Sequence, residues 1–406
     1  MKIIYIHQYF CTPKEPGGTR SYWFSKELVG RGHQVIMITS TNKAHPNSGR
    51  ITIDGIDVIY VKNEYSNYFS PLMKVWSFIK FVGLSIKQAS KEKNVDLVYA
   101  TSTPLTVGFV ALWLRWKKGW KYIFEVRDLW PEFPIQIGAI KNPFLIWLLR
   151  KFEKKIYDKA EFIVTLSPGM EAGVLKVGIP QSKVYVIPNM SKPEEFYPRE
   201  PNEKIIRQFG LDMTKFNVIH FGSMGVANGL GYIIDAALLA FQQGEYDVNF
   251  IFLGDGATLP QLQKCVQEKE LTNVQFLGNH KMSVVSEIVN CCDVSITSFL
   301  DIPILYTNSP NKLFDSLSAG KPIIVNSAGW TKDLVEKENC GCYVDPRSPQ
   351  NLVDKLLEIK DNQELLIEWS RNARRLSVEV FNRSKLSKQV AILIERITKN
   401  KNNISL

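Results

Sequence analysis

The sequence is poor in the residues that build metal sites and disulfide frameworks. Its 406 residues include six cysteines and five histidines, with no Cys-x-x-Cys pair and no clustering of the histidines. Neither a zinc site nor a set of disulfide bonds is supported, so we expect a reducing, cytoplasmic compartment. Because residues 1–6 lead at once into a strand-like run, we also expect no secretory signal peptide.

Long apolar runs are missing as well. No stretch reaches the roughly 18 consecutive apolar residues that a spanning helix needs. The formal net charge of +10 requires an anionic partner. The sequence lacks zinc-finger spacing, an RNA-recognition signature and an arginine-rich tail, so nucleic acid is not the expected partner.

The positive charges lie beside large apolar side chains in the first half of the chain. Such groups occupy residues 69–80, 113–121 and 144–155. Aromatic rings at the level of lipid headgroups, with lysine and arginine facing acidic lipids, would account for this pairing. Core helices with solvated edges are the alternative. We favour peripheral attachment to an anionic membrane surface, on the inner face of the cytoplasmic membrane.

What the sequence does contain is an alternation of strand and helix patterns. With 45% hydrophobic and 22% charged residues, the chain is a folded protein long enough for two or three domains. Apolar runs at 3–7, 34–40 and 122–126 alternate with helical patterns, which predicts an α/β class with parallel sheets covered on both faces. A segment rich in proline and polar residues, 188–198, is predicted to be an interdomain linker, after which the alternation restarts.

Two groups of polar residues in the first half are candidate ligand-binding positions. Gly17 and Gly18 precede a predicted helix, where backbone N–H groups can meet an anion and Arg20 can add a charge. Two glycines before a helix are also common turn chemistry. Arg127 and Asp128 follow a predicted strand, at the edge where open α/β sheets bind ligands. For this pair we favour a site over a structural ion pair.

In the second half, the most informative stretch is residues 309–324. Ser309 and Pro310 are predicted to open a short helix that carries Lys312 and Asp315 three residues apart, on one side. A cation near a helix start and a carboxylate one turn later suit a ligand with phosphate and hydroxyl groups. From these residues alone, an ordinary surface ion pair is the interpretation that we favour.

Taken together, these motifs resemble those of the retaining glycosyltransferases of family 4, in the bacterial branch that builds capsule or O-antigen repeats, similar to N-acetylfucosamine-type transferases. The resemblance implies the GT-B fold, in which two Rossmann-like doubly wound domains face a central cleft. It assigns residues 1–190 to the acceptor side and 191–382 to the nucleotide sugar, with a C-terminal helix at about 383–406 packing back on the first domain. It rests on Gly-Gly at 17–18, Arg-Gly-His-Gln-Val at 31–35, Arg-Asp-Leu-Trp-Pro at 127–131, Ile-Pro-Asn at 187–189, Gly-Asp-Gly at 254–256, and Asn-Lys-Leu-Phe-Asp with Ala-Gly-Lys-Pro within 311–322.

The resemblance also implies roles for individual residues toward a nucleotide-sugar donor, with UDP expected. Asp315 corresponds to the acid that holds the ribose, and Asp128 is expected to orient a hydroxyl. Arg20 and Arg127 are expected to supply charge in catalysis. The positions implied to contact the donor are Gly17, Gly18, Gly222, Ser223, Gly225, Asn311, Lys312, the backbone around Leu313, and Asp315.

Three departures from the family pattern leave the transferred sugar open. Thr307 stands where a glutamate is usual, and Ser223 and Asn228 stand where many members carry arginine and lysine. Arg127 replaces a common histidine.

The expected reaction transfers a hexose or N-acetylhexosamine to a polyprenyl-diphosphate-linked saccharide, with retention of configuration. The sequence has no Asp-x-Asp after a strand, so we expect neither a metal nor another cofactor. A nucleotide-sugar 2-epimerase of the same architecture and a non-catalytic binding subunit are the alternatives.

Overall fold

The computed structural model describes residues 1–15, 17–66 and 69–402 and divides the chain into two compact units. Unit 1 consists of Met1–Pro188 and Arg383–Leu406, and unit 2 of Asn189–Asn382. Some predicted features fall partly outside the described residues: Pro16, which precedes the Gly17–Gly18 pair, Tyr68, the first residue of a helix that the sequence pattern predicts over 68–91, and residues 403–406 of the predicted C-terminal helix. Each unit has its own sheet with helices, which confirms the α/β class.

Unit 1 is built on an eight-stranded sheet whose order is β3-β4-β2-β1-β5-β6-β7-β8. Every neighbouring pair is parallel except the hairpin of β3 and β4. The order reverses direction at β1, so its carboxyl end lies at the topological switch of the sheet. The strands are β1 (Lys2–Ile6), β2 (Gln34–Ser40), β3 (Gly49–Ile53), β4 (Ile56–Val61), β5 (Leu97–Thr101), β6 (Lys121–Val126), β7 (Phe162–Thr165) and β8 (Val184–Val186).

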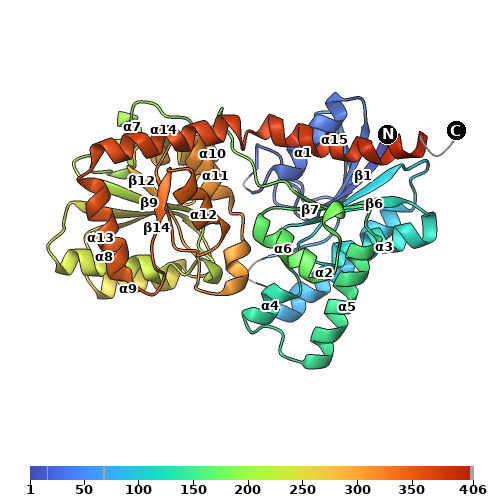
Figure 1. The fold of residues 1–406 in the computed structure, drawn as a ribbon, viewed down its shortest axis with the longest axis horizontal. Coiled ribbons are helices and arrows are strands. Elements are labelled where there is room, and N and C mark those ends of the chain that lie inside the picture. The colour runs from blue at the N-terminus through green and yellow to red at the C-terminus, as the bar shows by residue number, and fades with distance from the viewer. Residues whose placement is uncertain (16, 67–68, 403–406) are drawn as a thin grey trace. The chain divides into compact units, whose positions relative to one another are not determined.

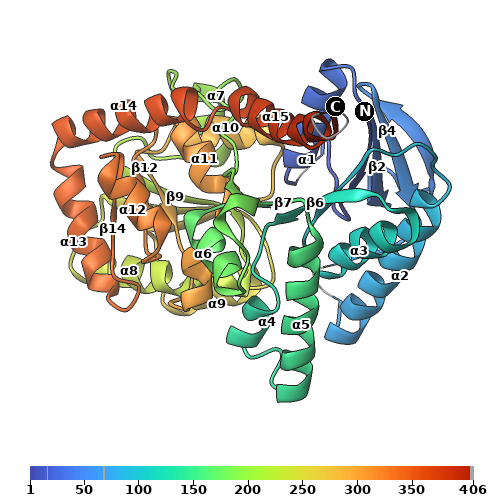
Figure 2. The same cartoon turned by 45° about the vertical axis from the view of Figure 1, so that its right-hand side comes forward.

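Helices cover both faces of this sheet, with α1 and α15 on one face and α2, α3 and α5 on the other (Figure 1; Figure 2). Three of the starts combine a capping side chain with a proline in the first turn: Ser70, Asn142 and Ser167 each accept a hydrogen bond from a backbone N–H three residues on. The helices are α1 (Arg20–Gly30), α2 (Pro71–Ala89), α3 (Thr106–Lys118), α4 (Glu132–Gln136), α5 (Pro143–Lys159), α6 (Pro168–Lys176) and α15 (Arg383–Asn402).

The last helix, α15, belongs to unit 1 although it follows all of unit 2 in the sequence. It packs against α1. Glu395 forms an ion pair with Arg31 at 3.3 Å, and its Oε1 lies within hydrogen-bond distance of His33 Nε2, at 3.1 Å. The guanidinium of Arg383 lies 3.6 Å from the ring centre of Trp23. Two distant segments of the chain therefore complete this unit.

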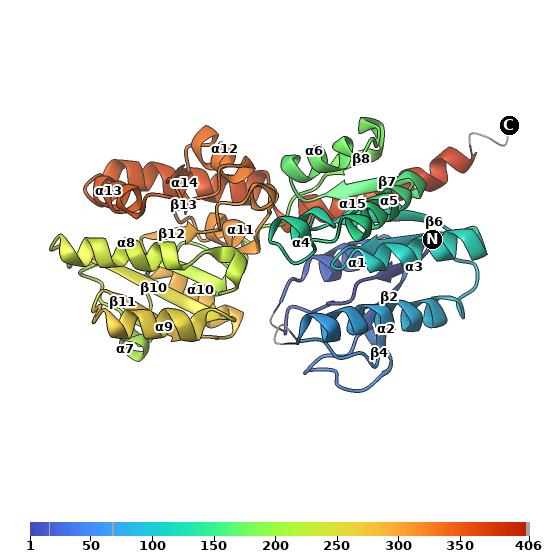
Figure 3. The same cartoon turned by 90° about the horizontal axis from the view of Figure 1, so that it is seen from below.

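Unit 2 has a six-stranded parallel sheet in the order β11-β10-β9-β12-β13-β14, with the direction reversing at β9. On one face, α8 packs with α9 and α13; Figure 3 shows α8 and α9 side by side. On the other, α11 packs against α14. The elements are α7 (Glu203–Phe209), β9 (Phe216–Ser223), α8 (Gly231–Gln242), β10 (Val248–Asp255), α9 (Leu259–Glu268), β11 (Val274–Gly278), α10 (Met282–Asn290), β12 (Val294–Thr297), α11 (Asn311–Ser318), β13 (Ile323–Val325), α12 (Trp330–Lys337), β14 (Gly341–Tyr343), α13 (Pro349–Lys360) and α14 (Gln363–Glu379).

The structure corrects the predicted linker at residues 188–198, because most of this segment packs inside unit 2. The backbone N–H of Ser191 donates to the Phe381 carbonyl at 2.8 Å, and that of Lys192 donates to the Ser318 hydroxyl at 2.9 Å. Phe196 is fully buried. Proline and polar residues here mark an irregular backbone, and its hydrogen bonds are made to neighbouring elements.

Candidate functional site

The carboxyl edge of the unit 2 sheet begins with a glycine turn at the end of β9. Gly222 has a φ of +102°, and a Cβ on Gly254 would lie 1.9 Å from the Gly222 carbonyl oxygen. A Cβ on Gly256 would lie 2.4 Å from the Met224 carbonyl oxygen. The last residues of β9 and β10 are therefore paired backbone to backbone, and Gly222 and Ser223 lie exposed at the rim.

A helix start lies at the same edge. α11 begins after Pro310, which offers no side-chain cap. The Leu313 amide donates to the Pro310 carbonyl at 3.2 Å, so the amides of Asn311 and Lys312 are the ones that can meet an anion. The predicted start residue, Ser309, does not cap the helix: its hydroxyl is buried without a hydrogen-bond partner among the described residues. Asn189 Nδ2 donates to the Ser309 carbonyl at 2.6 Å and so fixes the segment that enters the helix.

Lys312, in the first turn of α11, reaches back to the glycine turn. Its Nζ lies 3.0 Å from His220 Nε2 and 3.3 Å from Asn228 Oδ1. A Cβ on Gly222 would lie 3.7 Å from the Lys312 Cε, so the missing side chain leaves that flank of the lysine open. Burial lowers the pKa of Lys312 to about 7.

His220 is the partner that orients this lysine. Its Nδ1 lies 3.3 Å from the Ile296 carbonyl oxygen, which can only accept, so Nδ1 carries the proton and Nε2 is the acceptor. Burial, and next the Lys312 ammonium, hold the pKa of His220 well below its ordinary value. The imidazole is therefore neutral and accepts a hydrogen bond from the lysine.

Asp315 does not pair with Lys312, as the interpretation of a surface ion pair would require; its partner is Lys192. Asp315 is buried, and its Oδ1 lies 3.2 Å from Lys192 Nζ, within ion-pair distance, whereas Lys312 turns to His220. Burial raises the pKa of Asp315 and the nearby Lys192 opposes that rise. The ribose contact implied for Asp315 stays a prediction. Thr307 donates its hydroxyl to the Ile304 carbonyl at 2.7 Å.

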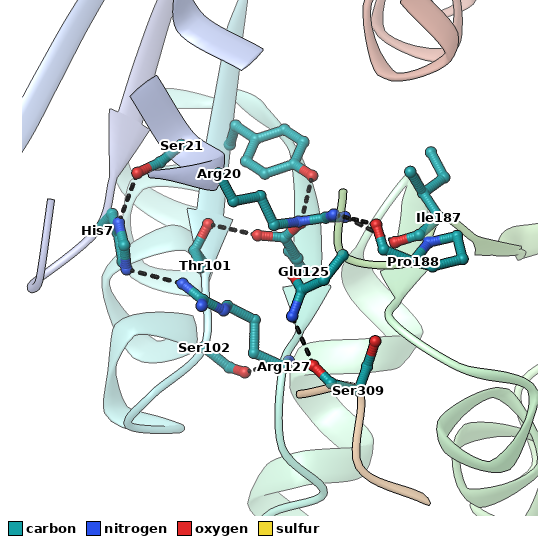
Figure 4. Close-up of polar contacts among 12 residues, drawn as sticks. His7, Arg20, Ser21, Thr101, Ser102, Glu125, Arg127, Ile187, Pro188 and Ser309 are labelled. Atoms are coloured by element: carbon teal, nitrogen blue, oxygen red, sulfur yellow. Dashed lines mark hydrogen bonds and ion pairs between the residues drawn. The ribbon is translucent and has the colours of Figure 1, made fainter. Parts of the chain in front are cut away.

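Unit 1 has a second polar network at the carboxyl edge of its own sheet (Figure 4). His7 follows β1 and is buried; its Nδ1 lies 2.8 Å from Ser21 Oγ, and its Nε2 lies 3.2 Å from an Arg127 Nη. A guanidinium only donates, so Nε2 accepts from Arg127 and Nδ1 donates to Ser21. Burial, and next Arg127, lower the pKa of His7. Ser102 Oγ accepts from the Arg127 backbone N–H at 2.8 Å.

Asp128 is oriented by a residue in an unusual backbone conformation. Thr103 has a φ of +95°, which is rare for a β-branched residue, and its hydroxyl donates to Asp128 Oδ2 at 3.1 Å. Burial raises the pKa of Asp128, whereas the Arg127 charge and this hydrogen bond oppose the rise. Strained residues cluster at functional sites, which supports the prediction that this aspartate serves a site.

Arg20 is engaged differently from the expectation that it adds a charge beside the glycine loop. Its Nε lies 2.7 Å from Glu125 Oε1, and its Nη atoms donate to the carbonyls of Ile187, at 2.7 Å, and Pro188 (Figure 4). Glu125 therefore neutralises the charge of Arg20. The guanidinium also fixes Ile187 and Pro188, the residues that follow β8 and precede unit 2. We now propose a positioning role for Arg20. In the loop itself, Gly17 has a φ of +139° and Gly18 is half-buried.

Sequence patterns missed four of the residues that organise these networks: His7, Glu125, Lys192 and His220. The available signal was a single polar residue within or directly after an otherwise apolar strand, as in His7, Glu125 and His220. Buried polar groups of this kind need partners, so their presence at strand ends indicates a network. Within the described ranges, no three His, Cys, Asp or Glu side chains gather closely enough to hold a metal ion.

Comparison with known proteins identifies both halves of the chain. Residues 17–190 match the glycosyl transferase 4-like domain, and residues 201–376 match glycosyl transferases group 1. A probable glycosyltransferase, WbjE of Pseudomonas aeruginosa, is 26% identical over 68% of this chain and 69% of its own. The alpha-monoglucosyldiacylglycerol synthase of Acholeplasma laidlawii is 24% identical over 93% of each chain.

A solved structure supports the fold over the full length. Anabaena Alr3699/HepE, crystallised with UDP and glucose, matches with a TM-score of 0.73 at 17% identity, over 97% of this chain and 99% of its own. The two domain matches and the two parallel-sheet units agree with the predicted architecture. The chain is therefore an enzyme that belongs to the glycosyltransferases with the GT-B fold.

Proposed function

We propose that this glycosyltransferase moves a hexose or N-acetylhexosamine from a UDP-sugar to a polyprenyl-diphosphate-linked saccharide, with retention of anomeric configuration, in capsule or O-antigen synthesis. The position of Lys312 is the main support for the donor part of this proposal. This lysine lies in the first turn of α11, and its side chain lies beside Gly222 at the end of β9. Helix-start amides and a cation together suit a diphosphate.

The demanding event in such a transfer is departure of the nucleotide diphosphate. The bond between the sugar's anomeric carbon and the phosphate oxygen breaks, and the acceptor oxygen bonds to that carbon on the same face. The acceptor's proton passes to the leaving phosphate oxygen, so no separate base is needed. Lys312 and the α11 amides stabilise the charge that develops on the phosphate. Since these groups supply positive charge, we propose that the reaction is metal-independent.

On the unit 1 side, we propose that Asp128 orients a hydroxyl of the acceptor or the donor. We also propose that Arg127, which donates a hydrogen bond to His7, supplies positive charge in catalysis. Both residues follow β6 at the carboxyl edge of the unit 1 sheet. Ligands of open α/β sheets bind at this edge. Gly17 and Gly18 are proposed to contact the donor, and Asp315 its ribose.

The lipid-linked acceptor is suggested by exposed aromatic side chains on adjacent helices of unit 1. Trp76 on α2 is 67% exposed, Trp116 on α3 72%, and Phe144 and Trp147 on α5 71% and 54%. Core helices with solvated edges would have buried these rings. α3 packs against both α2 and α5, and Lys117 Nζ lies 3.8 Å from the centre of the Trp116 ring.

We propose that this surface rests on an anionic bilayer on the cytoplasmic side. Rings and lysines at one surface match the headgroup region, where each lysine contributes roughly 1 kcal/mol with acidic lipids. Over the described part of the chain, no helix combines the length and apolar character that crossing a membrane requires.

The membrane proposal predicts a loss of vesicle binding when Trp116, Lys117, Lys118 and Trp147 are all replaced by serine. Sedimentation with vesicles of phosphatidylglycerol and phosphatidylcholine in equal parts should weaken at least about thirtyfold, since the two lysines alone account for about that factor. The matched control replaces Tyr246 and Ile367 of unit 2, which are 58% and 51% exposed. Unchanged sedimentation of the variant with all four substitutions would contradict the membrane proposal.

The donor and the reaction are tested together by mass spectrometry, which gives the added mass, and by proton NMR, which gives the configuration of the product and of any epimerised donor. The protein is incubated with a panel of UDP-sugars, with and without a polyprenyl-diphosphate-linked monosaccharide. We expect an acceptor heavier by one sugar, α-configured when the donor is α-configured. An epimerised donor in the incubation without acceptor would favour the 2-epimerase, and inversion of the anomeric centre would contradict the proposed mechanism.

A further inference from the structure

The ammonium of Lys312 is held by neutral acceptors. His220 Nε2 and Asn228 Oδ1 lie 3.0 and 3.3 Å from Nζ. His220 presents its lone pair because its Nδ1 proton is directed to the Ile296 carbonyl. An ammonium only donates, so the carboxamide of Asn228 turns its oxygen to the lysine. The lysine therefore has a fixed position without a counter-charge from these two side chains.

The charged groups on the elements around α11 are directed elsewhere. On α11 itself, Asp315 pairs with Lys192. On α14, Arg374 donates to the Ser318 carbonyl at the opposite end of α11. At the end of β10, the Asp255 carboxylate accepts from the next backbone amide. β12 and β13, which also pack against α11, carry no titratable side chain, and β9 contributes His220 alone.

Lys312 is half-buried, and an ammonium withdrawn from part of its water, with hydrogen bonds but no counter-charge, is poorly stabilised in its charged form. Desolvation favours the neutral amine, and the positive end of the α11 dipole acts in the same direction. A diphosphate bound at the helix start would reverse this balance, because an anion close by favours the charged lysine. Lys312 would then be fully protonated only when the ligand is bound.

We propose that His220 and Asn228 form a neutral cradle that positions Lys312 at the diphosphate site, and that donor binding draws a proton from solvent onto this lysine. The proposal rests on the proposed function, because it takes the donor's diphosphate as the ligand of α11. Within that function, His220 is a positioning residue and Lys312 is the group that touches the donor.

The sign of the pH dependence follows from linkage. The pKa of Lys312 in the free protein is about 7, and binding of the diphosphate raises it. Affinity is therefore fully present below about pH 7 and falls as the pH rises through the pKa of the bound state. At about pH 7, roughly half of the free molecules hold a neutral lysine, so each UDP should take up about half a proton.

Isothermal titration of the full chain with UDP measures this uptake. The binding enthalpy is recorded in buffers of different ionisation enthalpy, and its slope gives the number of protons taken up. Lys312→Arg is the matched control, since a guanidinium stays charged and any proton change in UDP itself is common to both proteins. We expect about half a proton more in the natural protein than in Lys312→Arg.

The positioning role of His220 predicts opposite results for two substitutions. His220→Phe removes the acceptor, so the free lysine is less often charged. We expect UDP to bind about tenfold more weakly and the uptake to rise toward about one proton. His220→Gln retains an acceptor and should keep the natural proton count. A merely structural histidine would lower thermal stability in both variants and leave the proton count unchanged.

The outcomes separate this inference from the proposed function. If UDP binds with the same proton count in the natural protein and in Lys312→Arg, the inference is overturned and the donor proposal stands. If UDP does not bind the natural protein, the donor proposal fails and the inference falls with it.

Discussion

Replacing Lys312 with methionine should lower kcat for sugar transfer by about 10²–10³-fold, the cost typical of removing one preorganised group from a developing oxyanion. The reason is geometric: His220 and Asn228 hold Nζ beside Gly222, where the proposed diphosphate would bind. Steady-state kinetics with the UDP-sugar that the mass-spectrometric panel selects provide the measurement.

The same substitution should not weaken the fold. The half-buried Lys312 ammonium has no carboxylate partner and carries a desolvation cost, and methionine fills nearly the same volume without that cost. We therefore expect an unchanged or slightly higher melting temperature beside the loss of kcat. Lys264→Met is the control, because this exposed lysine lies 3.6 Å from Glu268 one turn away, in a pair worth little. Full activity in Lys312→Met would exclude the lysine from catalysis.

Glu125→Ala should lower the free energy of unfolding by about 3–5 kcal/mol, because it leaves the Arg20 guanidinium buried and unpaired. The two side chains are 3% and 1% exposed, and Nε lies 2.7 Å from Oε1. Tyr99 and Thr101 also donate to this carboxylate, at 3.2 and 3.1 Å, and would lose their acceptor. Urea denaturation followed by circular dichroism gives the change.

An exposed ion pair of similar length provides the comparison. Glu203 lies 2.8 Å from Arg207, with both side chains at least 80% exposed, and Glu203→Ala should cost at most about 1 kcal/mol. The double variant Arg20→Met with Glu125→Leu should lose less than the two single variants together, since no charge stays buried. Equal losses for Glu125→Ala and Glu203→Ala would contradict the assigned network.

The strands were largely predictable from the sequence because buried parallel strands read as continuous apolar runs. β2 has the predicted bounds, 34–40, and β6 begins one residue before the predicted 122–126. Gly222 at the end of β9 was expected from the family resemblance, and its φ of +102° shows the local backbone requirement that glycine meets there. Such signals lie within a few residues of the position that they describe.

The networks were not predictable, because they join residues that are far apart in the sequence. Lys312 meets His220 across 92 positions, and Arg127 meets His7 across 120. Composition also misled at Lys192: a segment rich in proline and polar residues suggested an interdomain linker, yet the segment belongs to unit 2 from Asn189 on, and this lysine is buried against Asp315. Composition indicates an irregular backbone but does not distinguish an exposed segment from a packed one.

The return of α15 to unit 1 has a consequence for how the protein is made. During synthesis, α1 is translated long before Arg383. Trp23 and His33 therefore lack their contacts with α15 until all of unit 2 has been translated. N-terminal domains commonly fold first on the ribosome. Here the second unit in the sequence is the first that can be completed, and unit 1 can close only around the last helix.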